Sequence, residues 1–268
     1  MTPARRWAIR SGWLAVVLVA GCTPSKVHPA PVPSRPVAVS FDGLPQVGAL
    51  FAGAADQGLH FCSASVVHSP AGNVIATAAH CLSGTGVGLW FVPGYHDGVA
   101  PYGTWAVEAA YVDPRWLRDR DPHADYAFLT VSPQRVDGRP VEVEQAVGGD
   151  RLAVDRGFTT PVTVVAYPGR VGGRAIMCAA TTYAHQGYPG FDCRGYVDGT
   201  SGGAWLTDYR PATRRGRLYG VIGGLHQGGC SPDTSYTSYF DASTAKVLDR
   251  AARAATPDTV PSAGGDGC

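Results

Sequence analysis

Two short segments decide how this sequence is interpreted: T-A-A-H-C, from Thr77 to Cys81, and D-G-T-S-G-G-A-W, from Asp198 to Trp205. Between them, A-D-Y-A-F-L-T-V places Asp125 directly before an apolar run. A serine that attacks a carbonyl carbon needs a base to take its proton and an acid to orient that base. It also needs hydrogen-bond donors for the oxygen that becomes negative. The segments supply His80, Asp125 and Ser201, in that order along the chain.

Short runs of β-forming residues recur around these segments, separated by Gly, Pro and Asp. They are Val47–Phe51, Phe61–Val67, Val74–Ala78, Gly88–Val92, Trp105–Val112, Tyr126–Val131, Pro161–Tyr167 and Leu218–Gly223. Only Ala242–Ala255 has the apolar spacing of a helix. The 268 residues include 35 glycines and 21 prolines, which is typical of many turns. We therefore expect an all-β chain, built as an antiparallel barrel or sandwich.

The N-terminal residues have the pattern of a targeting segment. A basic start at residues 5–10 precedes an apolar run, Trp13–Ala20, which is shorter than the roughly 20 residues needed to cross a bilayer. The run ends in V-A-G-C at Cys22, which resembles the bacterial lipoprotein signal, whose cysteine becomes the lipid-modified N-terminus. We expect residues 1–22 to be this signal; an ordinary secretion signal with an incidental cysteine is the alternative.

The composition of the following residues predicts the domain organisation. Residues 23–44 are rich in Pro, Ser and Val without a periodic apolar face, which predicts an extended linker. Residues 45–255 form the expected folded domain, and 256–268 a C-terminal tail. The formal net charge of +1 gives no electrostatic reason to expect a nucleic-acid partner. We expect an extracytoplasmic monomer, either anchored to a bacterial membrane by lipid or secreted.

The cysteines favour an oxidising compartment. The chain has seven, and setting Cys22 aside leaves an even number for disulfide bonds. They are Cys62, Cys81, Cys178, Cys193, Cys230 and Cys268. Spacing alone leaves their pairing open. The sequence contains no C-x-x-C pair, so we expect no structural zinc site. No other motif indicates a cofactor or a dedicated metal site; calcium held by scattered loop carboxylates is the alternative.

These motifs resemble those of the trypsin-like (chymotrypsin-fold) serine peptidases, particularly the bacterial branch. T-A-A-H-C matches the histidine motif of that family completely, and G-T-S-G-G matches its G-D-S-G-G motif except at Thr200. The resemblance spans roughly Val47 to Arg250. It implies two packed antiparallel six-stranded β-barrels followed by a C-terminal helix. It also implies a serine endopeptidase whose partner is a protein or peptide substrate.

The resemblance assigns a role to each residue of the site. It makes His80 the general base and then the general acid, and Asp125 the residue that orients the imidazole. Ser201 becomes the nucleophile, and the backbone N–H groups of Gly199 and Ser201 form the oxyanion hole. Other carboxylates compete for the role of the acid, but only Asp125 directly enters an apolar run. The competitors are Asp113, Asp119 and Asp121.

Thr200 departs from the family pattern. Animal digestive members have an aspartate here that pairs with a newly cleaved N-terminal amine, and threonine cannot form that ion pair. The chain also lacks an I-V-G-G start. We therefore expect the oxyanion hole to form without that activation step.

The resemblance also implies disulfides and a substrate pocket. Cys62–Cys81 would anchor the histidine loop, and Cys178–Cys193 would join two strands of the second barrel. Cys230 and Cys268 are then the pair that remains, and their bond would staple the tail. The substrate pocket would be built near Gly195, Tyr196 and His226, with no carboxylate at its base. The segment around His226 resembles that of bacterial glutamyl endopeptidases, which implies a preference for Glu or Asp; a packed or surface histidine is the alternative.

Three other functions fit parts of the pattern. G-T-S-G-G also satisfies the G-x-S-x-G elbow of α/β-hydrolases, but the acid and histidine after it, Asp208 and His226, lie close together without the expected strand and helix around Ser201. An inactive peptidase homologue could use the same barrels to bind a protein. A hydrolase of small esters could use the same three residues.

Overall fold

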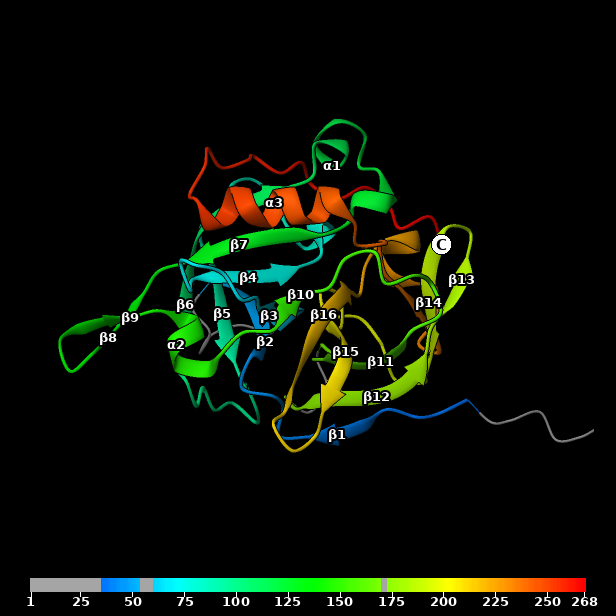
Figure 1. Ribbon diagram of the computed structural model, residues 1–268, viewed down its shortest axis with the longest axis horizontal. Helices are drawn as coiled ribbons and strands as arrows, with labels where there is room; N and C mark the ends of the chain where they lie inside the picture. The colour runs from blue at the N-terminus through cyan, green and yellow to red at the C-terminus, as the bar shows by residue number, and fades with distance from the viewer. Residues whose placement is uncertain (1–34, 54–59, 170–172) are drawn as a thin grey trace, which may run out of the picture. The chain divides into compact units, whose positions relative to one another are not determined.

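The computed structural model describes residues 35–53, 60–169 and 173–268, and residues 35–268 form one compact unit (Figure 1). The signal peptide expected at residues 1–22, the lipidation site Cys22 and most of the 23–44 linker lie outside the described residues. Within the described part, no helix is long and apolar enough to cross a membrane.

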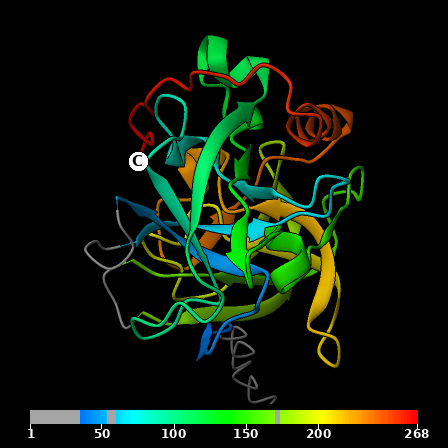
Figure 2. The same ribbon diagram turned by 90° about the vertical axis from the view of Figure 1, so that its left-hand side faces the viewer.

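The first half of the domain is a closed barrel in the order β2-β3-β4-β7-β6-β5 (Figures 1 and 2). Its strands are β2 (Val47–Ala52), β3 (His60–Val66), β4 (Val74–Thr77), β5 (Leu89–Pro93), β6 (Trp105–Val112) and β7 (Ala127–Val131). Every neighbouring pair is antiparallel, as the sequence predicts. Their side chains form a core in which Leu50, Phe91 and Phe128 are fully buried.

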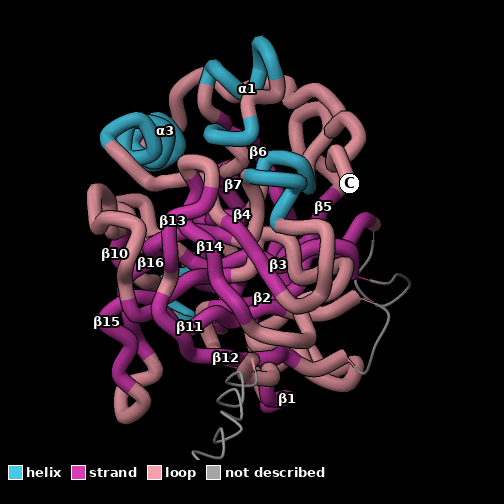
Figure 3. The backbone as a smooth tube through the Cα atoms, turned by 90° about the vertical axis from the view of Figure 1, so that its right-hand side faces the viewer, coloured by secondary structure: helices cyan, strands magenta, loops and turns pink. Residues whose placement is uncertain are grey.

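The second half contains a six-stranded sheet in the order β1-β12-β11-β15-β16-β10 and a three-stranded sheet, β13-β14-β17 (Figure 3). The strands are β1 (Val39–Phe41), β10 (Arg151–Leu152), β11 (Pro161–Ala166), β12 (Ala175–Thr181), β13 (Tyr183–His185), β14 (Tyr188–Asp192), β15 (Ala204–Arg210), β16 (Arg215–Val221) and β17 (Thr234–Tyr236). The chymotrypsin-like architecture is confirmed. In detail, the second half is divided into two sheets, and its β10–β16 pair is parallel.

Short helices and one hairpin complete the domain. They are η1 (Ala79–Cys81), α1 (Pro114–Asp119), η2 (Pro122–Ala124), α2 (Val143–Val147), η3 (Leu225–Gly228), α3 (Ala242–Ala252), and the strands β8 (Gln134–Val136) and β9 (Arg139–Val141). The predicted C-terminal helix is present as α3. It begins at a capping box, in which the Asp241 carboxylate accepts hydrogen bonds from the Ser243 and Thr244 N–H groups.

Part of the predicted linker is ordered structure. β1 pairs with β12, and Ser40 lies opposite Ile176. The order therefore begins before Leu44, the position expected from the proline-rich composition. Composition misses this strand because its partner lies far away along the chain, and the edge of a sheet can accept a strand whose outer side chains stay exposed.

The three expected disulfide pairings, two implied by the family resemblance and one by the cysteines that remain, are confirmed. Cys62 bonds Cys81, Cys178 bonds Cys193, and Cys230 bonds Cys268. The last bond holds the end of the tail, which also pairs with the first barrel through hydrogen bonds between Val260 and Gly84. Residues 256–268 are therefore an anchored segment.

Close packing of the first barrel generates a prediction at Gly48 in β2. A Cβ atom there would collide with the Val92 carbonyl oxygen and come within 2.6 Å of the Phe91 ring. We expect Gly48→Ala to lower the free energy of unfolding by about 1–3 kcal/mol, because an overpacked strand must shift. Urea or thermal unfolding measures this loss.

The matched control is Gly265→Ala, the same change at a site where a Cβ atom has no neighbour within 4 Å. Equal unfolding free energies for the two variants would contradict the packing argument.

Candidate active site

His80 lies on the turn η1, directly after strand β4 of the first barrel. The preceding residues, Ala78 and Ala79, are fully buried, and the bond from Cys81 to Cys62 ties the turn to β3. The His80 side chain is only 8% exposed. The backbone of His80 is therefore held on its N-terminal side by the strand and the buried alanines, and on its C-terminal side by the disulfide.

Asp125 lies between η2 and β7, and β7 is the neighbour of β4 in the barrel, so the segment before β7 meets the segment after β4. Its carboxylate is completely buried and lies 2.7 Å from His80 Nδ1. The other carboxylate oxygen accepts a hydrogen bond from the His80 backbone N–H at 2.9 Å. A third donor, the Gly224 N–H, comes from the second half of the domain at 2.8 Å. The buried charge therefore has donors from both halves.

The competing carboxylates are used elsewhere. Asp113 caps the N-terminus of α1, Asp121 caps η2, and Asp119 forms an exposed ion pair with Arg118. Among the four candidates, Asp125 is the carboxylate that the structure brings to His80.

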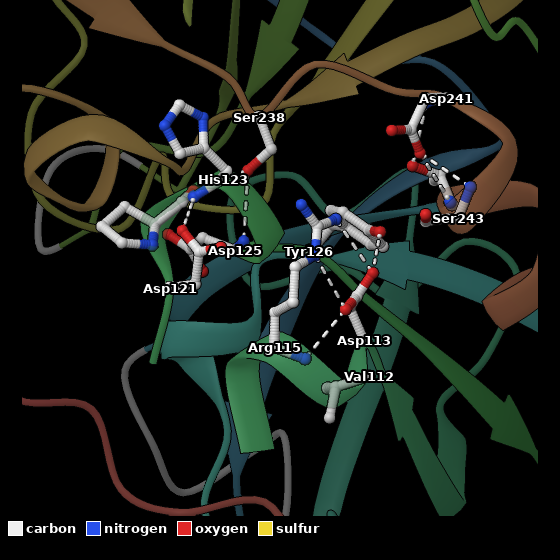
Figure 4. A network of polar contacts seen from close by, with 12 residues as sticks. Val112, Asp113, Arg115, Asp121, His123, Asp125, Tyr126, Ser238, Asp241 and Ser243 are labelled. Atoms are coloured by element: carbon white, nitrogen blue, oxygen red, sulfur yellow. Dashed lines mark hydrogen bonds and ion pairs between the residues drawn. The ribbon is translucent and has the colours of Figure 1, made fainter. Parts of the chain in front are cut away.

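Ser238 supports the backbone of Asp125 (Figure 4). The Asp125 N–H donates to Ser238 Oγ at 3.1 Å, and the Ser238 hydroxyl donates to the Pro122 carbonyl at 3.0 Å. Ser238 has no exposed surface. Sequence analysis misses this residue because it lies 113 positions from Asp125 and carries no motif of its own.

A second polar group fixes the strand that follows Asp125 (Figure 4). The Tyr126 hydroxyl donates to Asp113 at 2.7 Å, and Arg115 pairs with the same carboxylate at 3.0 Å. Burial alone would raise the pKa of Asp113, but the hydrogen bonds from Arg115 and Tyr126 outweigh it and lower that pKa. Asp113 thus stays ionised and anchors the loop that carries Asp125.

Ser201 is half-buried in the turn between Gly199 and Gly203. Its carbonyl accepts a hydrogen bond from the Ser63 N–H at 2.7 Å, which ties the turn to β3. The next residue, Gly202, is packed so closely that a Cβ atom would collide with Thr77 and lie 3.1 Å from the Ala78 nitrogen. These contacts place the serine turn against the segment that leads to His80. Among the described residues, the Ser201 hydroxyl makes no hydrogen bond.

The backbone of this turn leaves two N–H groups available. Gly199 has φ of +90°, and a Cβ atom there would collide with the Gly169 backbone. The carbonyls of Asp198 and Gly199 are bonded into the protein, to the Gly169 N–H and the Ser63 hydroxyl. By contrast, the N–H groups of Gly199 and Ser201 donate to no other described residue. Two such donors in one turn are suited to an oxyanion.

Thr200 stabilises the turn locally. Its hydroxyl donates to the Val197 carbonyl at 2.7 Å, and its N–H points to the same oxygen at 3.1 Å. The threonine is 3% exposed, so this hydroxyl is satisfied inside the protein. The turn therefore has its conformation without an ion pair to an N-terminal amine.

The three residues expected to form a substrate pocket differ in burial and in the parts of the chain that they contact. Tyr196 is buried, and its hydroxyl donates to the Val164 carbonyl at 2.8 Å; burial raises its pKa. Gly195 precedes it with φ of +114°. His226 lies in η3 with φ of +51°, and its Nδ1 is 3.1 Å from the carbonyl oxygen of Asp266 in the C-terminal segment.

Two groups of side chains have the spacing of metal ligands: Cys62 and Cys81 with His80, and Cys230 and Cys268 with His226. In each group the two cysteines are bonded to each other. Their sulfur atoms are therefore not thiolates, the form that binds a metal ion.

A closed antiparallel barrel, a second β-sheet half and a C-terminal helix, with a His–Asp pair beside a glycine-flanked serine, define the chymotrypsin-like fold. Several similar solved structures carry the names of proteases, and others carry the name of human heparin-binding protein, with a TM-score of 0.59 at 14% identity, covering 82% of this chain and 98% of its own. The protease Anisep from Arthrobacter nicotinovorans has a TM-score of 0.68 at 23% identity, covering 81% of this chain and 100% of its own. A thermostable serine protease, AL20, from an extremophilic microorganism has a TM-score of 0.65 at 25% identity, covering 78% and 97%.

A Glu endopeptidase structure is also similar, with a TM-score of 0.60 at 16% identity, covering 81% of this chain and 97% of its own. The sequence matches no protein-family model and no curated relative. At these identities the likeness establishes the fold, whereas the function depends on the residues of the site.

The support of Asp125 generates a prediction at Ser238. We expect Ser238→Ala to lower the free energy of unfolding by about 1–3 kcal/mol, because two buried hydrogen bonds of the hydroxyl would be lost and the Asp125 N–H would keep only its 3.3 Å contact with the Pro122 carbonyl. Denaturant titration measures the loss. Ser243→Ala is the control, since Ser243 contacts Asp241 through its backbone N–H. If both variants unfold at the same denaturant concentration, Ser238 does not support this loop.

Proposed function

We propose that this protein is a serine endopeptidase that cleaves peptide bonds through an acyl-enzyme intermediate. The observation that carries the proposal is the buried His80–Asp125 pair, bonded at 2.7 Å, beside the turn that holds Ser201, in which the N–H groups of Gly199 and Ser201 donate to no described residue. The protease names of similar folds agree with it. The proposed partner is a protein or peptide, and no cofactor enters the reaction.

The geometry of the pair sets the protonation of the imidazole. With Nδ1 facing a carboxylate, the proton of neutral His80 lies on Nδ1, which leaves Nε2 as the base. In the first step, Ser201 Oγ attacks the carbonyl carbon while Nε2 takes the serine proton. The N–H groups of Gly199 and Ser201 then stabilise the oxyanion.

Collapse of the tetrahedral species completes acylation. The C–N bond breaks, His80 gives its proton to the leaving amine, and the acyl group stays on Ser201. Water then attacks the ester with His80 again as base, releasing the acid and the free hydroxyl. Asp125 stays ionised throughout and stabilises the imidazolium that forms twice per cycle.

The chemistry of the site generates the central prediction. We expect the purified protein to react with a fluorophosphonate probe at Ser201, and Ser201→Ala to abolish both labelling and peptide hydrolysis. Asp125→Asn should lower kcat by about 10⁴-fold, because asparagine favours the wrong imidazole tautomer. Rates on a peptide library report the activity and the residue preference, including any preference for Glu or Asp through His226.

Asp119→Asn is the control for Asp125→Asn, because the same change falls on an exposed carboxylate paired with Arg118. A folded protein that the probe leaves unlabelled would favour the alternative, an inactive homologue that binds protein. Turnover of small esters without turnover of any peptide would favour an esterase.

The proposed location is outside the cytoplasm, on a lipid anchor at Cys22. Three disulfides suit an oxidising compartment. Residues 1–22 are proposed as the signal and residues 23 to about 34 as a spacer between the membrane and the monomeric domain.

The anchor generates its own prediction. When the full chain is expressed in a bacterium, labelled palmitate should be incorporated and the protein should sediment with membranes. Cys22→Ala should abolish both, because the lipid is attached to this sulfur. Palmitate incorporation that persists in Cys22→Ala would contradict the lipoprotein signal.

A further inference from the structure

The chain does not end at α3 but continues along the first barrel. Asp258 pairs with Arg250 at 2.8 Å and accepts a hydrogen bond from the Val112 N–H at 2.9 Å. Val260 is 2% exposed and exchanges backbone hydrogen bonds of 2.7 and 2.8 Å with Gly84. These contacts fix the base of the last segment, residues 260–268, which we call the strap.

The rest of the strap contacts other loops. The Arg120 guanidinium donates to the Ser262 carbonyl at 2.7 Å. The Gln227 side chain donates to the Gly264 carbonyl at 2.8 Å, and the Asp266 carbonyl oxygen lies 3.1 Å from His226 Nδ1. The bond between Cys268 and Cys230 then fixes the end. The strap therefore joins the first barrel to the second half of the domain.

Each of the three loops that the strap contacts also carries or adjoins a residue that belongs to the candidate active site or bonds to it. Gly84 follows His80 on the same loop, Arg120 precedes Asp125 on the next, and His226 follows Gly224, whose N–H binds the Asp125 carboxylate. Figures 1 and 2 show the red end of the chain leaving α3, passing over α1 and ending on the opposite side of the domain. The strap thus runs along the rim that these three loops form.

The contact with residues 226–230 indicates which part of a substrate would meet the strap. This segment belongs to the wall expected to receive the residue before the cleaved bond. The acyl part of a substrate, which is N-terminal to that bond, would therefore extend toward the strap. The leaving part would extend away from it.

A purely structural staple is the simpler interpretation, but the contacts do not favour it. Asp258 and Val260 already anchor the segment to the barrel, whereas residues 264–268 are exposed and make no core contact. Cys230 and Cys268 are both exposed, while Cys62, Cys178 and Cys193 are buried. The last bond therefore fixes a surface segment in place at the site rim.

We propose that the strap closes one end of the substrate cleft and restricts the enzyme to substrates with a short segment N-terminal to the cleaved bond. The proposal rests on the proposed peptidase function and specifies its substrate class. Short N-acyl groups and residues near a free N-terminus fit under the strap. A long extended segment on that side would have to displace it.

The test compares substrates of different length in the wild type and in a variant without the bond, Cys230→Ser/Cys268→Ser. The substrates share the residue at the cleaved bond and the leaving group, and carry one, two or four residues N-terminal to that bond. We expect kcat/KM for the longest substrate to rise at least about tenfold in the variant, while that for the shortest changes less than about twofold. Fluorophosphonate labelling of Ser201 is measured on each protein.

A second variant, Cys230→Ser in a chain that ends at Pro261, lacks residues 262–268 of the strap and serves if the first variant folds poorly. We expect it to show the same change in the dependence of kcat/KM on substrate length. Arg120→Ala should shift the profile in the same direction but less. Arg118→Ala is its control, because Arg118 pairs with Asp119 and not with the strap.

The outcomes separate the two proposals. If the wild type and the variants are labelled and their kcat/KM values depend on substrate length in the same way, the strap proposal is overturned and the peptidase proposal stands. A wild type that neither labels nor cleaves any substrate would overturn the peptidase, and the strap proposal with it.

Discussion

The negative charge of Asp125 lies where no solvent reaches it, and much of the site is arranged around that fact. An unpaired buried carboxylate would cost several kcal/mol, so it must receive hydrogen bonds from the protein. Here it receives them from the His80 ring, the His80 backbone and the Gly224 N–H. Because these donors come from both halves of the domain, satisfying one charge also sets the position of the halves at the site.

The serine turn has the opposite requirement, since it must keep donors unsatisfied. A folded chain normally pairs its buried N–H groups. Here the carbonyls of Asp198 and Gly199 are bonded into the protein, whereas the N–H groups of Gly199 and Ser201 donate to no described residue. Thr200 completes this arrangement through a local bond to Val197. Rigid attachment of the carbonyls therefore makes the free N–H groups possible.

The rim of the site is built differently from its centre. Buried groups with short hydrogen bonds hold Asp125, whereas side chains at the surface and one exposed disulfide hold residues 261–268. Exposed contacts contribute little stability individually. The covalent bond at the end of the chain is consequently the main constraint on that segment.

The sequence alone was sufficient for the fold class and most strands of the first barrel, because motifs and apolar runs are local patterns. The disulfide pairs needed the family resemblance as well, since cysteine spacing leaves the pairing open. It also singled out Asp125 among four carboxylates, since only that residue enters an apolar run. Tertiary structure alone decided the role of Ser238, the pairing of β1 with β12 and the course of residues 260–268. These features depend on contacts between residues far apart in the chain, and such contacts leave no periodic or local signal in the sequence.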